Sequence, residues 1–113
     1  MRIISGKYKG KKLNQPVDDL TRPLKDMVKE SIFNLIIHSN KAKINIEKAE
    51  VLDLFSGSGS FGLECISRGA IKVVFCENYQ PAIKILKKNI KSLNQDKKID
   101  VFDEDIFVKL GNK

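Results

Sequence analysis

A glycine-rich turn between an apolar run and a short amphipathic segment constrains this chain more than any other feature. Val51–Phe55 predict a short, mostly apolar strand, and Gly57-Ser58-Gly59-Ser60-Phe61-Gly62 follows almost at once. The residues from Phe61 to Arg68 predict a helix that Gly69 ends. Glycines in such a turn let the chain reverse tightly and let a ligand touch the main chain. A strand, a G-x-G-x-x-G turn and a helix in this order predict a ligand-binding loop in a parallel sheet.

The sequence after this loop continues the alternation of strands and helices. Residues 73–76 are β-branched, aromatic and apolar, and they predict a second buried strand. Pro81 opens a helix, and residues 99–102 predict a third strand. The apolar stripe of this helix is Ile83, Leu86, Ile90 and Leu93, and its lysines, Lys84, Lys87, Lys88 and Lys91, fall mostly on the solvent side. The pattern predicts an α/β fold with a parallel, right-handed sheet.

The region before residue 49 has a different pattern. Residues 2–13 predict a small hairpin, because two glycines interrupt short apolar and basic stretches. Thr21-Arg22-Pro23 resembles a helix entrance. The face of this helix that we expect to be buried is Leu24, Val28, Ile32, Leu35 and Ile36, with Lys25, Asp26, Lys29 and Glu30 elsewhere. We therefore predict a basic N-terminal extension over residues 1–48 and the first half of an α/β domain over residues 49–113.

Three strands with two crossover helices make half of such a domain. Doubly wound folds usually need more than about 150 residues to cover both faces of the sheet, and this chain has 113. We expect a truncated or partial protein, with an incomplete sheet and an exposed edge.

The chain has a formal net charge of +7, and the excess is local. Residues 1–48 carry a net +6 and residues 49–113 a net +1, while five basic residues and no acid lie between Arg2 and Lys12. This distribution predicts a surface that faces a polyanion, although 18 lysines against 3 arginines also fit a solvated charge run.

No apolar run is long enough to span a bilayer, and no signal peptide is apparent, so we expect a cytoplasmic protein. Cys65 and Cys76 predict buried, reduced thiols. With a single histidine, His38, no metal site is expected.

Two acidic residues suggest which ligand the loop takes. Asp53 precedes Gly57 by four positions and stands near the mouth of the loop. A carboxylate there would repel the pyrophosphate of a dinucleotide by about 1 kcal/mol or more, whereas S-adenosylmethionine carries an ammonium and a sulfonium. Glu77 ends the second strand, where it can accept hydrogen bonds from ribose hydroxyls. Asp105 follows the third strand and can accept from an adenine amino group. These positions favour S-adenosylmethionine, although Asp53 could instead orient the turn.

Three motifs together resemble a known family. They are residues 1–13, then Thr21-Arg22-Pro23 leading into residues 28–35, then Val51–Gly59. The chain is similar over nearly its whole length to the bacterial 16S ribosomal RNA guanine-N2 methyltransferases of the RsmD type. The resemblance implies a class I S-adenosylmethionine-dependent methyltransferase with a Rossmann-like sheet. It implies that Asp53, Phe55, Gly57 and Gly59 line the methionine end of the donor, Glu77 holds the ribose and Asp105 the adenine. It also implies RNA contacts by the basic N-terminal segment, at Arg2, Lys7, Lys9, Lys11, Lys12 and Arg22.

One expected motif is missing. The family places Asn/Asp-Pro-Pro-Tyr/Phe after its fourth strand, where it holds the target amine and stacks on the flipped base. Here the prolines, Pro16, Pro23 and Pro81, are not adjacent. We therefore expect the 113-residue chain alone to bind donor without methylating, and the whole protein to act as a monomer on 16S rRNA or the assembling small ribosomal subunit. The alternatives are a methyltransferase for another RNA or DNA base, and a non-catalytic RNA-binding fragment.

Overall fold

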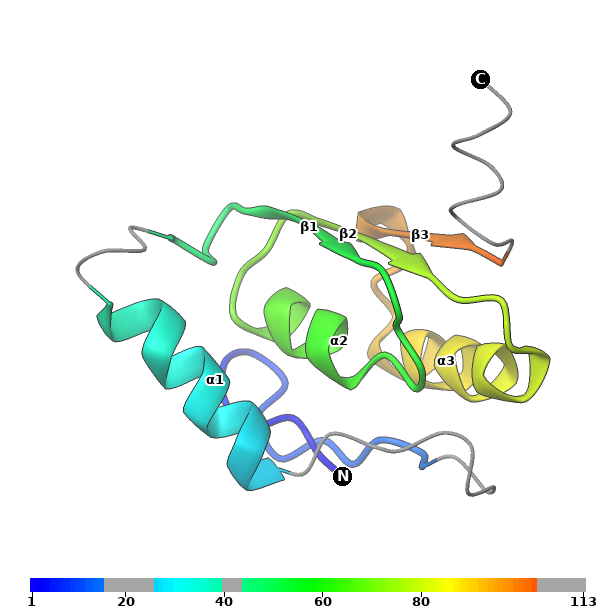
Figure 1. Ribbon diagram of the computed structural model, residues 1–113, viewed down its shortest axis with the longest axis horizontal. Helices are drawn as coiled ribbons and strands as arrows, with labels where there is room; N and C mark the ends of the chain where they lie inside the picture. Colours follow the sequence, from blue (N-terminus) through cyan, green and yellow to red (C-terminus); the bar gives the residue numbers. More distant parts are fainter. Residues whose placement is uncertain (16–25, 40–43, 104–113) are drawn as a thin grey trace.

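A computed structural model describes residues 1–15, 26–39 and 44–103 (Figure 1). The elements are α1 (Asp26–His38), β1 (Glu50–Asp53), α2 (Ser60–Ser67), β2 (Lys72–Cys76), α3 (Gln80–Leu93), the 3-10 turn η1 (Asp96–Lys98) and β3 (Ile99–Phe102). The strands and helices predicted from residue 51 onward are confirmed, except that β1 ends at Asp53 and leaves Leu54 and Phe55 to the turn. Within the described ranges, no helix is both long and apolar enough to cross a membrane.

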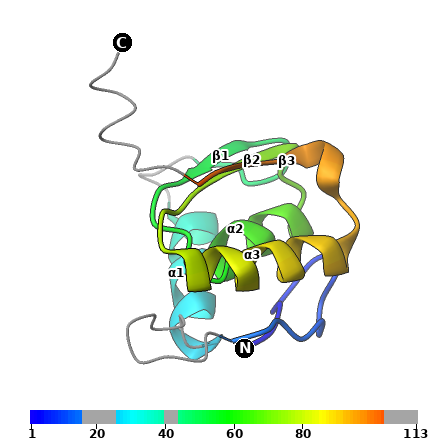
Figure 2. The ribbon, with the colours of Figure 1, turned by 90° about the vertical axis from the view of Figure 1, so that its right-hand side faces the viewer.

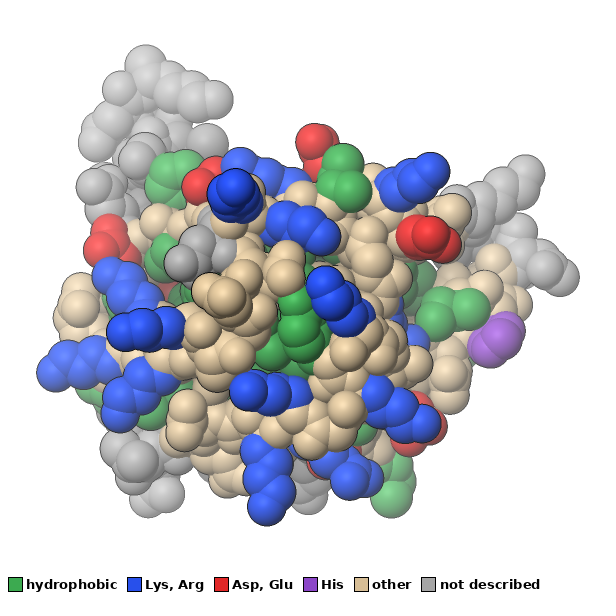
Figure 3. Space-filling model, turned by 180° about the vertical axis from the view of Figure 1, so that it is seen from behind, with side chains coloured by type: hydrophobic (Ala, Val, Ile, Leu, Met, Phe, Trp, Pro, Cys, Tyr) green, Lys and Arg blue, Asp and Glu red, His purple; other side chains and the backbone are tan. Residues whose placement is uncertain are grey.

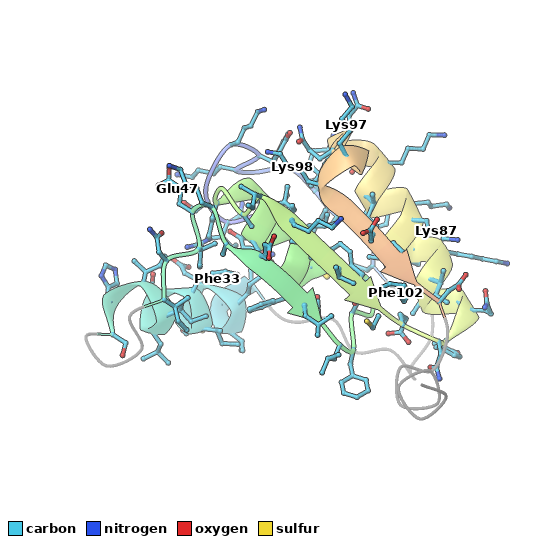
Figure 4. The ribbon with its side chains drawn as sticks, turned by 90° about the horizontal axis from the view of Figure 1, so that it is seen from above. Phe33, Glu47, Lys87, Lys97, Lys98 and Phe102 are labelled. Carbon is cyan, nitrogen blue, oxygen red and sulfur yellow. The ribbon has the colours of Figure 1, made fainter. Side chains whose placement is uncertain are left out.

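The three strands form one parallel sheet in the order β1-β2-β3. Val73 pairs with Val51 on one side and with Ile99 on the other. All three α-helices lie on the same side of the sheet (Figures 1 and 2). Figure 4 looks onto the opposite face, where Leu52 is 60% exposed and Phe102 39% exposed. The predicted α/β fold and its incomplete sheet are confirmed.

The core lies between the sheet and the helices. Val73, Phe75 and Ile99 alternate with half-buried or exposed residues along their strands and point toward the helices. The predicted stripe of α3, Ile83, Leu86, Ile90 and Leu93, is buried. A Cβ atom on Gly62 would lie 2.3 Å from Cε1 of Phe75, so glycine at this position lets α2 pack closely on β2.

The N-terminal segment forms the predicted hairpin in a reduced form, with a single antiparallel bridge between Arg2 and Lys12. The Ile3 amide donates to the Lys11 carbonyl, and the Gly10 amide donates to the Ile3 carbonyl. Ile3 and Leu13 are buried in the same core as the sheet residues. The hairpin is therefore part of the packed body, and the proposed division between residues 48 and 49 stays a prediction.

The predicted buried face of α1 is wrong in part. Ile36 is partly buried against the core, and Ile32 is half-buried. Leu35 is 71% exposed and Val28 45% exposed, and Leu24 lies outside the described residues. The fully buried side chains of α1 are Lys29 and Phe33. Phe33 stacks on Phe61 of α2, with ring centroids 4.9 Å apart.

Lys29 is buried because it enters an ionic network centred on Glu64 of α2. Its Nζ lies 3.2 Å from a Glu64 oxygen and donates to the Arg2 carbonyl at 2.6 Å and to the Ser60 hydroxyl at 3.0 Å. The other Glu64 oxygen accepts from Nε of Arg68 at 2.8 Å. The amides of Ile4 and Ser5 also donate to this carboxylate, at 2.9 and 3.0 Å. The carboxylate thereby fixes the first strand of the hairpin on α2.

Candidate functional site

The carboxyl ends of the parallel strands meet at one edge of the sheet, and acidic residues stand there. Asp53 is the last residue of β1, Glu77 follows β2, and Asp103 follows β3. The glycine-rich loop runs from this edge into α2. Ligands of open α/β sheets bind outside this edge, so the loop and these acids form the candidate site.

Ser56 holds the loop to the sheet. Its hydroxyl donates to the Asp53 carbonyl at 2.8 Å and accepts from the Cys76 amide at 3.1 Å. Its own amide donates to the Cys76 carbonyl at 3.2 Å. Ser56 thus joins the ends of β1 and β2 at the first turn of the loop. The only signal of this role in the sequence is the position of Ser56 directly after the strand.

The two glycines predicted to line the donor site have backbone conformations that favour glycine. Gly57 has φ 54° and Gly59 has φ 86°. The Gly57 amide donates to a carboxylate oxygen of Glu77 at 2.8 Å, and the other oxygen accepts from the Tyr79 amide at 3.1 Å. Glu77 therefore connects the loop to the turn that precedes α3. The oxygen bonded to Tyr79 also accepts from the Asn78 amide at 3.2 Å. A carboxylate oxygen has two acceptor sites, so the oxygen bonded to Gly57 keeps one site for a ligand hydroxyl.

Asp53 is the most perturbed carboxyl group at this edge. Burial raises its pKa from 3.8 to about 6, the negative charge of Glu77 adds to the rise, and a hydrogen bond from the Gly62 backbone opposes it. Its buried Oδ2 has no hydrogen-bond partner within the described residues. Buried polar atoms are usually paired because desolvation without a partner is costly. An unpaired carboxylate oxygen beside a glycine loop is what a site for a cationic or hydrogen-bond-donating ligand would present.

These residues fit S-adenosylmethionine better than a dinucleotide. The carboxylates of Asp53 and Glu77 already repel each other, and a diphosphate would add to that repulsion, whereas a cation would relieve it. Phe55, also predicted to line the site, is 76% exposed in the turn after β1. Asp105 lies outside the described residues. No group of three or more potential metal ligands is found among the residues that the structure describes.

Five of the six residues predicted to contact RNA are among those that the structure describes. Arg2, Lys7, Lys9, Lys11 and Lys12 are all exposed on the hairpin, whereas Arg22 lies outside the described residues. Arg2 also pairs with Asp26 of α1, at 3.5 Å. The structure thus brings five of the six together on one segment.

The hairpin extends from one end of α2 to the other. Met1 Sδ lies 3.6 Å from the Ser58 hydroxyl in the loop before α2. At the far end of α2, the Lys7 and Tyr8 amides donate to the carbonyl and the hydroxyl of Ser67, both within 2.9 Å. A helix of eight residues spans about 12 Å. The tip of the hairpin and the candidate loop are therefore separated by about the length of α2.

A parallel sheet with a glycine loop and acidic residues at its carboxyl edge is the arrangement of Rossmann-like methyltransferases, and comparison with known proteins agrees. The hypothetical protein TTHA0928 of Thermus thermophilus aligns with a TM-score of 0.77 and 27% identity, over 99% of this chain and 60% of that one. Ribosomal RNA small subunit methyltransferase D of Haemophilus influenzae is 41% identical over 93 residues, which are 82% of this chain and 45% of that protein. The Escherichia coli K12 protein of the same name is 37% identical over 93 residues, 82% of this chain and 44% of that protein.

The family model described as Conserved hypothetical protein 95 matches residues 1–113. The chain belongs to this family, which is the RsmD family that the sequence motifs indicated. It spans about half the length of the curated relatives it matches.

Proposed function

We propose that the protein methylates the exocyclic N2 of a guanine in 16S rRNA and that this chain provides the binding site for S-adenosylmethionine. Three relatives named ribosomal RNA small subunit methyltransferase D, at 37–41% identity, support the reaction class and the RNA substrate. The observation that carries the donor site is the unpaired Oδ2 of Asp53 beside the glycine loop.

Each residue of the edge has a distinct task in this proposal. Asp53 offsets positive charge at the methionine end, beside the main chain of Gly57 and Gly59. Glu77 accepts hydrogen bonds from the ribose, Asp105 accepts from the adenine amino group, and the exposed ring of Phe55 flanks the methionine end. When bound, S-adenosylmethionine supplies a methyl group on a cationic sulfur that an amine lone pair can attack. Catalysis then depends on positioning rather than on a nucleophilic side chain.

The acceptor side is proposed to combine this chain with other parts of the whole protein. Arg2, Lys7, Lys9, Lys11, Lys12 and Arg22 contact RNA phosphates, and the Asn/Asp-Pro-Pro-Tyr/Phe motif of the family holds the target base. The 113-residue chain alone binds donor without transferring methyl. The whole protein is proposed to act as a cytoplasmic monomer on 16S rRNA or the assembling small subunit.

Titration calorimetry tests the donor site. We expect binding of S-adenosylmethionine, no binding of NAD at comparable concentration, and at least tenfold weaker donor binding after Asp53→Asn or Glu77→Gln. Glu50→Gln, an exposed carboxylate at the other end of β1, is the matched control. Gly59→Val is a poor test, because a Cβ there would lie 2.4 Å from Cδ1 of Leu86 and disturb the fold. Tighter binding of NAD than of S-adenosylmethionine would overturn the assignment.

Transfer of tritiated methyl groups tests the reaction. The whole protein, incubated with unmodified small subunits, is expected to label 16S rRNA, and digestion of the product should give N2-methylguanosine. Label on a different base would favour the alternative of another base specificity. RNA binding without any transfer by the whole protein would favour a non-catalytic RNA-binding role.

A further inference from the structure

A second basic segment lies outside the residues assigned to RNA so far. α3 carries Lys84, Lys87, Lys88 and Lys91 with no acidic residue, and η1 adds Lys97 and Lys98. All six side chains are exposed, and none of them pairs with a carboxylate among the side chains that the structure describes, which do not include Asp96. Lys91 offsets the helix dipole at the C-terminal end of α3. Lys84, Lys87 and Lys88 lie before the last turn, where that effect has faded, so helix stability does not account for them.

The basic residues are concentrated in two segments, so a lysine-rich composition alone does not explain them. Among the described residues, the hairpin and residues 80–98 together hold eleven basic residues and one acidic residue. The remaining described residues hold four basic and nine acidic residues. Three of those four, Lys29, Arg68 and Lys72, lie within 3.2 Å of a carboxylate oxygen. A lysine-rich composition would add positive charge throughout, whereas here it is confined to two segments.

Two sets of side-chain hydrogen bonds fasten these segments to each other. Asn89 of α3 is fully buried; its Oδ1 accepts from the Asn14 amide at 2.7 Å, and its Nδ2 donates to the Asn14 carbonyl at 3.1 Å. Beyond the end of α3, Nε2 of Gln95 donates to the hydroxyl of Tyr8 in the hairpin. Figure 2 shows the hairpin beside the C-terminal half of α3. The two basic segments are thus held in a fixed relation before any partner binds.

Basic side chains cover much of one face of the molecule. Figure 3 shows lysine and arginine side chains spread over the face seen from behind Figure 1, with acidic side chains mainly toward its margins. Figure 4 places Lys97 and Lys98 near one end of α3 and Lys87 beside the helix. A shallow recess between α3 and η1 is lined by Asn94, Gln95, Lys97 and Lys98. Among the side chains that the structure describes in that lining, lysine is the only charged type.

We propose that α3 and η1 form, together with the hairpin, one continuous RNA-binding face, in which Lys84, Lys87, Lys88, Lys91, Lys97 and Lys98 contact the phosphate backbone. This rests on the proposed function, because it extends the RNA contact from the hairpin to a second element. Lys84 and Lys91 are seven residues apart, or about 10 Å along the helix. That length matches several phosphates along one strand. The face carries no base-reading motif and therefore positions the RNA while other parts select the base.

Equilibrium binding to unmodified 16S rRNA over a series of salt concentrations tests the proposal, with three double variants of the whole protein. Lys84→Gln with Lys88→Gln removes two charges from α3, and Lys9→Gln with Lys11→Gln removes two from the hairpin. Lys48→Gln with Lys72→Gln removes two from outside the proposed face and serves as the matched control. Each lysine that contacts a phosphate contributes about 1 to the slope of log K against log salt. Circular dichroism and S-adenosylmethionine binding verify that each variant is folded.

We expect the slope to fall by about 2 in the α3 variant and in the hairpin variant, and to stay at the wild-type value in the control. A wild-type slope for the α3 variant, with a reduced slope for the hairpin variant, would overturn this proposal and leave the proposed function intact. An equal fall in the control would also overturn it, because the attraction would then depend on net charge alone. Wild-type slopes in all three variants would contradict the RNA contact in the proposed function as well.

Discussion

The substitution Asp53→Asn should make the folded chain more stable at neutral pH, although it removes a residue of the proposed donor site. Burial raises the pKa of Asp53 from 3.8 to about 6, so at pH 7 the side chain is ionised in a site that disfavours its charge. Oδ2 has no partner within the described residues to offset this cost. Asparagine has nearly the same shape and no charge, so it keeps the packing and removes the penalty.

The magnitude follows from proton linkage. Because the pKa of Asp53 rises on folding, the folded state binds the proton more tightly than the unfolded state. Protonated Asp53 therefore stabilises the fold at low pH, and this stabilisation is lost as the pH rises through 6. The full effect of such a rise is about 3 kcal/mol. Relative to pH 7, protonation stabilises the folded chain by about 1 kcal/mol at pH 5 and about 2 kcal/mol at pH 4. The stability difference between Asp53→Asn and the wild type should therefore be larger at pH 7 than at pH 4 by about 2 kcal/mol.

Urea denaturation of both proteins at pH 4, 5, 6 and 7 measures this difference directly, because other titrating groups cancel between them. Glu50→Gln, which changes an exposed carboxylate on the same strand, is the matched control. A difference between Asp53→Asn and the wild type that does not vary between pH 4 and pH 7 would refute the reasoning. The same variant should bind S-adenosylmethionine more weakly. Because its stability should rise at the same time, the weaker binding could not be attributed to unfolding.

Three further changes test other parts of the structure. Glu64→Ala should destabilise the fold by about 3–5 kcal/mol, because it leaves Lys29 buried without its carboxylate. Thermal unfolding measures this loss of stability. A loss below about 1 kcal/mol would contradict the account of the ionic network. Gly62→Ala should cost about 1–3 kcal/mol through its clash with Phe75, and combination with Phe75→Leu should restore part of the loss in denaturant titrations. The pKa of Cys65 is raised to about 12, chiefly by burial, so this thiol should not react with a thiol reagent at pH 8 until the protein unfolds; rapid labelling of the native protein would argue against its burial.

The sequence predicted the sheet and its loop well because their signals are local. Residues 73–76 are a short apolar run and residues 99–102 combine apolar residues with one charged residue, both between turns, while the residues of α3 fall into one apolar stripe and one lysine face. The family motifs then supplied an interpretation of the loop that composition alone could not. The roles of Asp53, Phe55, Gly57, Gly59, Glu77 and Asp105 remain predictions.

The orientation of α1 and the role of Asn89 could not be predicted, because they depend on contacts distant in sequence. Apolar residues occur on more than one side of α1, so its periodicity did not identify a unique buried face. Lys29 can be buried because it pairs with Glu64, 35 positions later, and donates a hydrogen bond to the carbonyl of Arg2. Asn89 is buried because it binds Asn14 and the Ser58 carbonyl. Polar residues with such partners have no recognisable pattern in a single sequence.

The contacts that attach the hairpin to α2 have a consequence for how the family can diverge. Glu64 and Ser67 receive the amides of Ile4, Ser5, Lys7 and Tyr8, that is, the main chain rather than side chains. Every residue except proline offers the same amide. Outward-facing positions of the hairpin can therefore be exchanged during evolution while the attachment itself persists unchanged.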